Sequence, residues 1–190
     1  MRMAISSMKF RRRREAVTDY KKRLGIVKSG LDRVVVRKTN KRIIGQIVRY
    51  GTGGDIVLAH ADSGELAGFK WPSRPNRLTA YLTGLLLAKK AGKHAHGDHI
   101  LDIGIASPVA GSVPFVFAKG CIDGGMKLRG TLKIDEKSYG TAASRYASEL
   151  KSKDSAKYGR LFSAYIKAGF APENLGSEFN SVKDKIMKKE

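Results

Sequence analysis

The chain has 190 residues, of which 42% are hydrophobic, so it is long enough to bury a core as one domain of ordinary size. Its formal net charge of +20 indicates a polyanionic partner and excludes no particular fold. The single cysteine, Cys121, excludes a disulfide within the chain, and no signal peptide is visible. The longest apolar run, residues 78–88, has about half the length of a membrane-spanning helix. We therefore expect a cytoplasmic protein.

The charge is concentrated in the first quarter of the chain. Residues 1–50 contain 16 Lys and Arg against 3 Asp and Glu, whereas residues 51–150 contain 12 against 9 and residues 151–190 contain 9 against 5. A basic block beside a nearly neutral body is typical of an arm that binds a polyanion. Nucleic acid is favoured over an anionic membrane, since the first 18 residues lack an apolar helix face. An acidic protein and a solubilising tail without a ligand are the alternatives.

The stretch KFRRRREAVTDYKKRL, residues 9–24, predicts contacts with RNA phosphates. A planar guanidinium binds two phosphate oxygens at once, and several of them on an arm follow irregular RNA while releasing counterions. Phe10 and Tyr20 either stack on unpaired bases or pack on the domain. We expect residues 1–17 to be extended or disordered, and a helix over residues 19–29 capped by Thr18. The candidate RNA-binding residues here are Lys9, Arg11, Arg12, Arg13, Arg14, Tyr20, Lys21, Lys22 and Arg23.

Three strands are predicted in close succession, over residues 33–39, 41–50 and 56–61. Short links between them favour an antiparallel meander. The first link is a tight turn at Thr39 and Asn40. The second, GTGGD, is interpreted as a hairpin turn because a strand follows it, whereas a phosphate-binding loop needs a helix there.

Basic residues are also dense on the first two of these strands. Arg33 and Arg37 share one face because they are an even number of residues apart, and Val34 and Val36 occupy the other. A solvated outer face is one interpretation; proximity to the basic arm favours a continuous surface facing RNA. The candidate RNA-binding residues here are Arg33, Arg37, Lys38, Asn40, Lys41, Arg42 and Arg49.

The rest of the chain predicts a mixed α/β domain followed by helices. A helix starts near Asn76 and ends at Gly92, a buried strand covers residues 99–107, and a second helix covers 113–128. The order of strands and helices places helices on the faces of the sheet. Further helices are predicted around 141–152, over 158–170 and after Pro172. We expect a basic arm and short helix in residues 1–30, an α/β core in 31–135 and a helical extension in 136–190.

No pattern of catalytic residues stands out, so an enzyme is not expected. HAHGDH, residues 94–99, lacks the spacing and the nearby thiol of a zinc site and is interpreted as a polar loop near RNA. A two-metal nuclease needs several converging carboxylates. Asp102 has no evident partner, and Cys121 has no nearby base. We expect no metal, no cofactor and no small-molecule substrate.

Six segments together carry a resemblance over nearly the whole chain: RRRREAVTDYKKRL, RVVVRKTNKRIIGQIVRY, GDIVLAHADSGEL, NRLTAYLTGLLLAKKAG, ILDIGIASPVAGSVPFVFAKGCIDGG and KYGRLFSAYIKAGF. The sequence resembles the large-subunit ribosomal protein family L-eighteen in its longer archaeal and eukaryotic form. The resemblance implies a ribonuclease H-like three-layer α/β/α core with a mixed sheet, a basic N-terminal arm and a C-terminal helical extension.

The resemblance also implies a function. Such a protein binds 5S rRNA and helps to attach it to the large-subunit rRNA in the central protuberance, beside neighbouring ribosomal proteins. The positions that match the family's RNA contacts are Arg11 to Arg14, Lys21 to Arg23 and Arg37 to Arg42. An RNA-processing enzyme on the same fold and a generic polyanion binder are the alternative functions.

Overall fold

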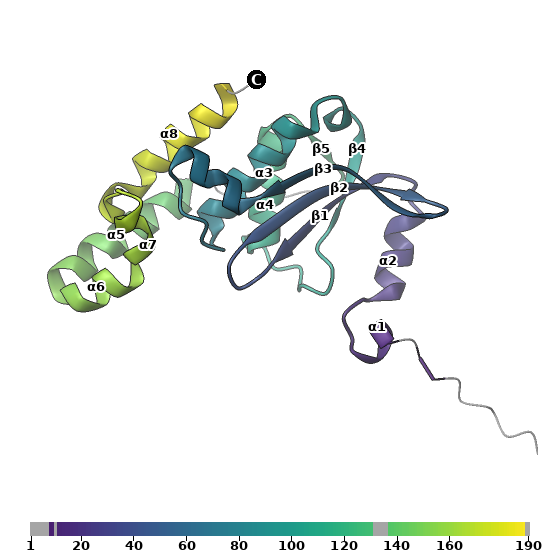
Figure 1. Cartoon of the computed structure of the whole chain (residues 1–190), viewed down its shortest axis with the longest axis horizontal. Helices are drawn as coiled ribbons and strands as arrows, with labels where there is room; N and C mark the ends of the chain where they lie inside the picture. The colour runs from purple at the N-terminus through teal and green to yellow at the C-terminus, as the bar shows by residue number, and fades with distance from the viewer. Residues whose placement is uncertain (1–7, 10, 131–136, 189–190) are drawn as a thin grey trace, which may run out of the picture.

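A mixed five-stranded sheet is the centre of the molecule, in the order β3-β2-β1-β4-β5 (Figure 1). The computed structural model describes residues 8–9, 11–130 and 137–188. The first three strands are antiparallel, β4 joins β1 in parallel, and β5 joins β4 in parallel. The predicted α/β class and the predicted meander are therefore confirmed. The strands are β1 (Asp32–Lys38), β2 (Ile43–Gly51), β3 (Gly54–Asp62), β4 (Asp98–Asp102) and β5 (Lys127–Leu128).

The meander follows from the alternation of side chains between the two faces of each strand and from two tight turns. Val34 and Val36 are buried on one face of β1, as predicted. Gly51 pairs with Gly54, so GTGGD is a hairpin turn with a two-residue loop. The turn after β1 is longer than predicted because the Thr39 hydroxyl accepts hydrogen bonds from the N–H groups of Lys41 (3.3 Å) and Arg42 (2.9 Å). As a result, β2 begins two residues after the predicted position.

Two helices, α3 (Arg77–Ala91) and α4 (Val113–Asp123), cover the face of the sheet that carries Val34. Asn76 caps α3 by accepting a hydrogen bond from the Thr79 N–H at 2.9 Å. The helices cross in very close contact, because a Cβ added at Gly84 would lie 2.1 Å from the Phe117 carbonyl oxygen. The core therefore depends on small residues at this crossing.

Two predicted elements end earlier than expected. The strand predicted over residues 99–107 ends at Asp102, because Gly104 has a positive φ of 63° and its N–H donates to the Asp102 carboxylate at 2.8 Å. The helix predicted over 113–128 ends at Asp123. Beyond it the chain turns, and β5 pairs with β4. The sequence therefore identified both elements and misplaced their C-terminal ends.

The N-terminal segment forms α1 (Arg11–Arg14) and α2 (Tyr20–Val27), at the end of the molecule near the β2–β3 hairpin (Figure 1). The prediction of an extended arm is wrong for residues 11–14, which form one helical turn. The cap of α2 is Asp19, whose carboxylate accepts from the Lys22 N–H at 3.1 Å, one residue after the predicted Thr18. The predictions for residues 1–7 and for Phe10 lie outside the described residues.

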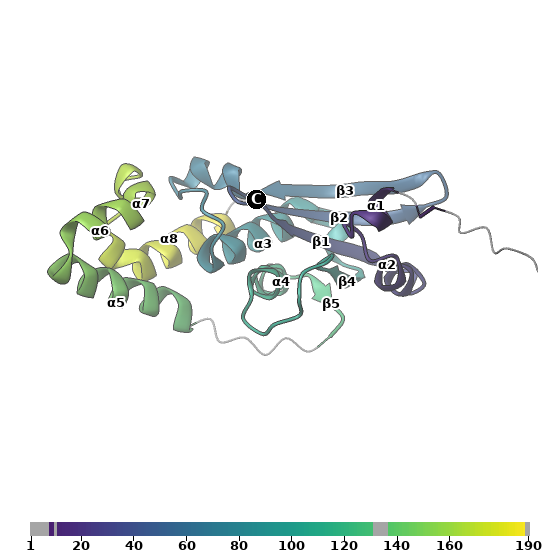
Figure 2. The same ribbon diagram turned by 90° about the horizontal axis from the view of Figure 1, so that it is seen from below.

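The C-terminal helices lie at the other end of the molecule (Figure 2). The predicted helix over 158–170 is two helices, because the chain leaves helical geometry at Phe162. No described helix combines the length and the hydropathy needed to span a membrane. The helices of this region are α5 (Lys137–Lys153), α6 (Ser155–Leu161), α7 (Ser163–Lys167) and α8 (Leu175–Lys188). The described residues also form the 3-10 helices η1 (Ser63–Phe69), η2 (Gly92–Ala95) and η3 (Pro172–Asn174).

The C-terminal helices share a core with the α/β body through Trp71. Trp71 is fully buried, and its ring centroid lies 5.8 Å from that of Tyr165, 5.8 Å from that of Phe170 and 6.3 Å from that of Phe179. Its indole N–H donates to the Thr79 hydroxyl at 3.0 Å. Burial raises the pKa of Tyr165, whose hydroxyl oxygen accepts from the Asn76 amide at 2.6 Å. The extension is thus packed onto the body by aromatic contacts.

Candidate nucleic-acid interface

The four arginines of α1 are all exposed. Arg11 is paired with Glu15, with 2.8 Å between Nε and the carboxylate. Arg14 donates to the sulfur of Met8 at 3.1 Å. The guanidinium groups of Arg12 and Arg13 have no hydrogen-bond or ion-pair partner in the part of the chain that the structure describes. Two guanidinium groups of the run are therefore available to phosphate without breaking any contact.

Helix α2 is attached to the body by charged side chains and buries none of its residues. The Lys22 ammonium donates to the Gly104 carbonyl at 3.3 Å, and the Arg23 guanidinium lies 2.7 Å from the Asp55 carboxylate. Tyr20 and Lys21 point to solvent. Because exposed ion pairs contribute little and are screened by salt, this attachment is weak.

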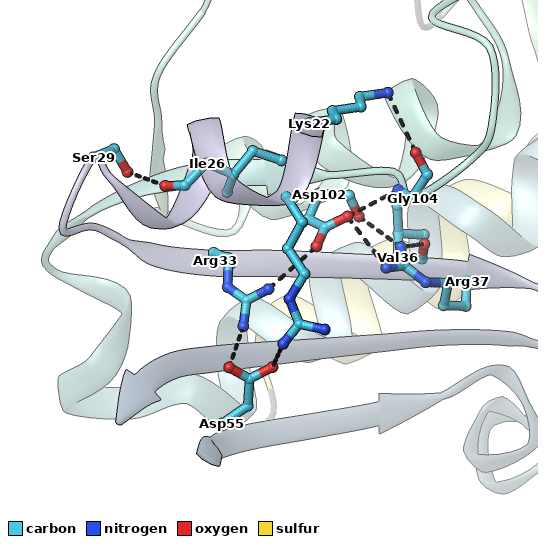
Figure 3. A network of polar contacts seen from close by, with 10 residues as sticks. Lys22, Ile26, Ser29, Arg33, Val36, Arg37, Asp55, Asp102 and Gly104 are labelled. Atoms are coloured by element: carbon cyan, nitrogen blue, oxygen red, sulfur yellow. Dashed lines mark hydrogen bonds and ion pairs between the residues drawn. The ribbon is translucent and has the colours of Figure 1, made fainter. Parts of the chain in front are cut away.

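Arg33 is not on the accessible surface, which corrects the prediction made for it. Only 4% of its side chain is exposed, beneath α2 and between two carboxylates. Its Nη2 lies 2.7 Å from Asp55, an ion pair without hydrogen-bond geometry, and its Nη1 donates to Asp102 at 3.4 Å. Figure 3 shows Arg33 between these two acidic residues. Arg33 therefore organises the charges of this face and is shielded from phosphate.

Asp102 has two partners that the sequence did not reveal. Besides Arg33, the Arg37 guanidinium donates to the Asp102 carboxylate at 3.2 Å and to its backbone carbonyl at 2.9 Å (Figure 3). The two arginines therefore share a face, as predicted. Charges alternate through this network in the order Arg23, Asp55, Arg33, Asp102, Arg37. Both carboxylates are held by guanidinium groups, so they position arginines.

The turn between β1 and β2 presents a second group of exposed side chains. Lys38, Asn40 and Lys41 are exposed, and neither ammonium has a partner in the described ranges. Arg42 lies 3.5 Å from the Asp62 carboxylate and remains largely exposed. Of the basic residues predicted to bind RNA, those whose side chains have no hydrogen-bond or ion-pair partner among the described residues are Lys9, Arg12, Arg13, Lys21, Lys38 and Lys41. We call these six residues the free cations.

Arg49 lies apart from this group. It alternates with Val48 along β2 and so points to the other face of the strand. It makes two hydrogen bonds to Asp32, from Nε at 2.9 Å and from Nη2 at 2.8 Å. The hydrogen bond from Arg49 lowers the pKa of Asp32 below its ordinary value. Arg49 is therefore held by a carboxylate of its own sheet through two hydrogen bonds.

The histidine-rich stretch is not a wholly exposed polar loop. His99 is fully buried on β4, with its ring nitrogens 2.9 Å from the His94 carbonyl and 3.3 Å from the Lys127 carbonyl. Among the described residues, no three side chains of His, Cys, Asp or Glu gather as a metal site would require. Burial raises the pKa of the Cys121 thiol, which makes it a poor nucleophile.

The geometry therefore offers a cationic surface for phosphates. Arg12 from α1, Lys22 from α2 and Lys38 from β1 line one cleft, so the basic arm and the sheet meet there. Sequence reasoning missed the acidic residues that arrange this surface, Asp55 and Asp102. Asp55 was hidden because it follows the glycines of a turn, and its partner Arg33 lies on a different strand.

A family model described as ribosomal large subunit proteins 60S L5 and 50S L18 matches residues 6–100. This range is half of the chain and runs from α1 to β4. It contains all six free cations and every member of the charged network except Asp102.

Proposed function

The chain belongs to the family of ribosomal large subunit proteins 60S L5 and 50S L18, and we propose that it binds 5S rRNA and helps to attach it to the large-subunit rRNA in the central protuberance. The observation that carries this proposal is the family match over residues 6–100. We also propose that the chain is located on the ribosome in the cytoplasm and contacts neighbouring ribosomal proteins.

The proposed contacts are electrostatic. The free cations reach phosphate without losing a side-chain hydrogen bond or ion pair to any described residue. The other basic side chains must exchange or share a partner: Arg11, Arg14, Lys22, Arg23, Arg37 and Arg42. A-form RNA has a major groove too deep and narrow for side chains to read. The chain therefore selects its RNA by shape and by unpaired bases, and phosphate contacts supply most of the affinity.

We also propose that the core is ribonuclease H-like and serves as a scaffold without nuclease activity. An antiparallel β1–β2–β3 meander continued by parallel β4 and β5 supports the fold. Asp55 and Asp102 are both paired with guanidinium groups, which supports the proposed lack of nuclease activity, since a two-metal site needs carboxylates free to bind metal cations. In this proposal residues 1–30 bind RNA, residues 31–135 form the core and residues 136–190 extend it.

The test is binding to 5S rRNA compared with a structured RNA of equal length, at 50 and 200 mM salt. The full chain is compared with a form that lacks residues 1–16, which keeps α2 and its Asp19 cap. We expect a preference for 5S rRNA of at least about a thousandfold, and a weaker salt dependence without the arm. Equal affinity for both RNAs would show a generic polyanion binder and would refute the proposal.

A further inference from the structure

A cleft of about 540 Å³ lies between α2 and the face of the sheet opposite α3 and α4. Its floor is formed by Val35 of β1, Gln46 and Val48 of β2 and Val57 of β3. These positions are neighbours across the strands, because Val35 pairs with Gln46 and Val48 pairs with Val57. The floor is thus a small apolar surface with one amide in it.

Exposed apolar side chains gather at this cleft. Val17, Val57 and Ile105 line it and are 51%, 51% and 68% exposed. They come from the N-terminal segment, from β3 and from the loop after β4. Single exposed apolar residues need no explanation, but three from separate segments around one hollow indicate a binding site.

Gln46 is the polar group of the floor. Its side chain is half-buried and has no hydrogen-bond partner in the described parts of the chain. A primary amide offers two donors and an acceptor side by side. This pairing of donor and acceptor complements the hydrogen-bonding edge of a nucleobase.

The rim of the cleft is cationic. Six basic side chains line the cleft, whereas the acidic residues are Asp19, Asp55 and Asp102. Each acid is engaged, Asp19 by the α2 cap and the other two by arginines. The basic residues are Arg12, Lys22, Arg23, Arg33, Arg37 and Lys38.

We propose that this cleft holds one unpaired nucleotide of the bound RNA. The base packs on Val35, Val48 and Val57 and hydrogen-bonds through its edge to Gln46. Its phosphates lie at Arg12 and Lys38, and the half-exposed Arg37 guanidinium offers a plane for stacking. The inference rests on the proposed function and specifies how that surface recognises RNA.

Other ligands would pair with fewer of the groups that line the cleft. An aliphatic peptide side chain would cover the floor but would leave the Gln46 amide and the charges of Arg12 and Lys38 without partners among the described residues. A simple anion would neutralise the rim but would leave the apolar floor in water. A nucleotide supplies a flat ring, a hydrogen-bonding edge and a negative charge within one ligand.

The first test replaces Gln46 by Leu, which removes the amide and keeps a side chain of similar size. We expect the affinity for 5S rRNA to fall about tenfold, as for the loss of one base contact. The salt dependence should stay the same, because no charge is removed. The unfolding midpoint of the free protein should not fall, because the amide has no partner within the described chain.

The second test fills the cleft with Val57→Trp and uses Ile56→Trp as its matched control. Ile56 is equally exposed, is the adjacent residue of β3 and does not line the cleft. We expect Val57→Trp to weaken 5S rRNA binding at least as much as Gln46→Leu, and Ile56→Trp to leave it unchanged. Equal losses in both variants would mean that bulk on the hairpin matters and the cleft does not.

The decisive probe is a set of 5S rRNAs, each with an abasic residue at one unpaired position. At one position the abasic residue should cost the wild type about tenfold and cost Gln46→Leu nothing, because coupled losses do not add. Free nucleoside monophosphates should bind only weakly. If they bound as tightly as RNA, the cleft would be a small-molecule site and the inference would be wrong.

The two proposals fail in different ways. If wild type prefers 5S rRNA while Gln46→Leu and Val57→Trp bind it equally well, the nucleotide site is refuted and the proposed function stands. If wild type binds 5S rRNA and the control RNA alike, the proposed function itself is refuted.

Discussion

The two ends of the molecule are attached to the α/β body by different kinds of interaction. Helix α2 buries no residue and is held by charged contacts such as Arg23 with Asp55. The C-terminal helices are held by rings around Trp71, which is fully buried. Salt screens ion pairs and phosphate competes for their cations, whereas neither weakens the burial of apolar area. A polyanion can therefore remodel the first attachment while the second stays intact.

The largest effect should come from the aromatic attachment. Trp71→Ala removes the ring shared by the body and the C-terminal helices, and we expect it to lower the free energy of unfolding by about 3–5 kcal/mol. Urea unfolding followed by circular dichroism measures this change. Leu161→Ala is the control, because Leu161 is exposed and its truncation should cost no more than about 0.5 kcal/mol. Similar losses in both variants would contradict a core centred on Trp71.

Two glycine substitutions test whether the core is packed more tightly than α2. Gly84→Ala places a Cβ 2.1 Å from the Phe117 carbonyl oxygen, and we expect a loss of about 1–3 kcal/mol in global stability. Gly25 lies inside α2, and a Cβ added there would meet no atom within 4 Å. Gly25→Ala should therefore raise the local stability of the helix by up to about 1 kcal/mol. Urea unfolding detects the first effect, and slower amide exchange in residues 20–27 detects the second. A global loss from Gly25→Ala would show that α2 is packed more tightly than the structure indicates.

Charge removal at each end tests which end binds RNA. The double change Arg12→Gln and Arg13→Gln should reduce the slope of log affinity against log salt by about 2, since each phosphate contact contributes about 1. The matched control is Lys185→Gln and Lys188→Gln on α8, which removes the same charge from exposed positions. Titrations of 5S rRNA at several salt concentrations measure both slopes. An equal reduction in the two variants would mean that net charge alone sets the affinity.

The smallest effect should be a pH-dependent contribution from Asp32. The hydrogen bond from Arg49 lowers the folded-state pKa of Asp32, so this pair stabilises the fold above the ordinary carboxyl pKa of about 4. The contribution is lost as the pH falls through the lowered folded value. Arg49→Ala should therefore lower the unfolding midpoint slightly at pH 7, and the difference from wild type should shrink as the pH falls below about 4. Lys188→Ala, which has no acidic partner in the described chain, should show no such trend.

Local patterns predicted much of the fold. The alternation of Val34 and Val36, the glycines of the β2–β3 hairpin and the Asn76 cap each depend on residues close in sequence, and each is confirmed. The ends of β4 and α4 were misplaced, because glycine turns outweigh the apolar pattern that continues past them.

The charged site was harder to predict, because its partners are far apart in sequence. Arg33 was expected at the surface, yet its carboxylate partners are Asp55 and Asp102, on β3 and at the end of β4. His99 begins the strand predicted over residues 99–107 and is buried there, but its ring contacts with the carbonyl groups of His94 and Lys127 could not be read from the sequence. Composition indicates how many charges a chain carries, and only the packing of strands shows which of them are already paired.

The most direct test of the account is hydrogen exchange of the full chain, free and bound to 5S rRNA. We predict that binding slows amide exchange in residues 11–28 and in the turn at residues 38–42, and leaves α5 to α8 unchanged. Slower exchange confined to α5 to α8, with the N-terminal segment unchanged, would contradict the assignment of the RNA-binding surface.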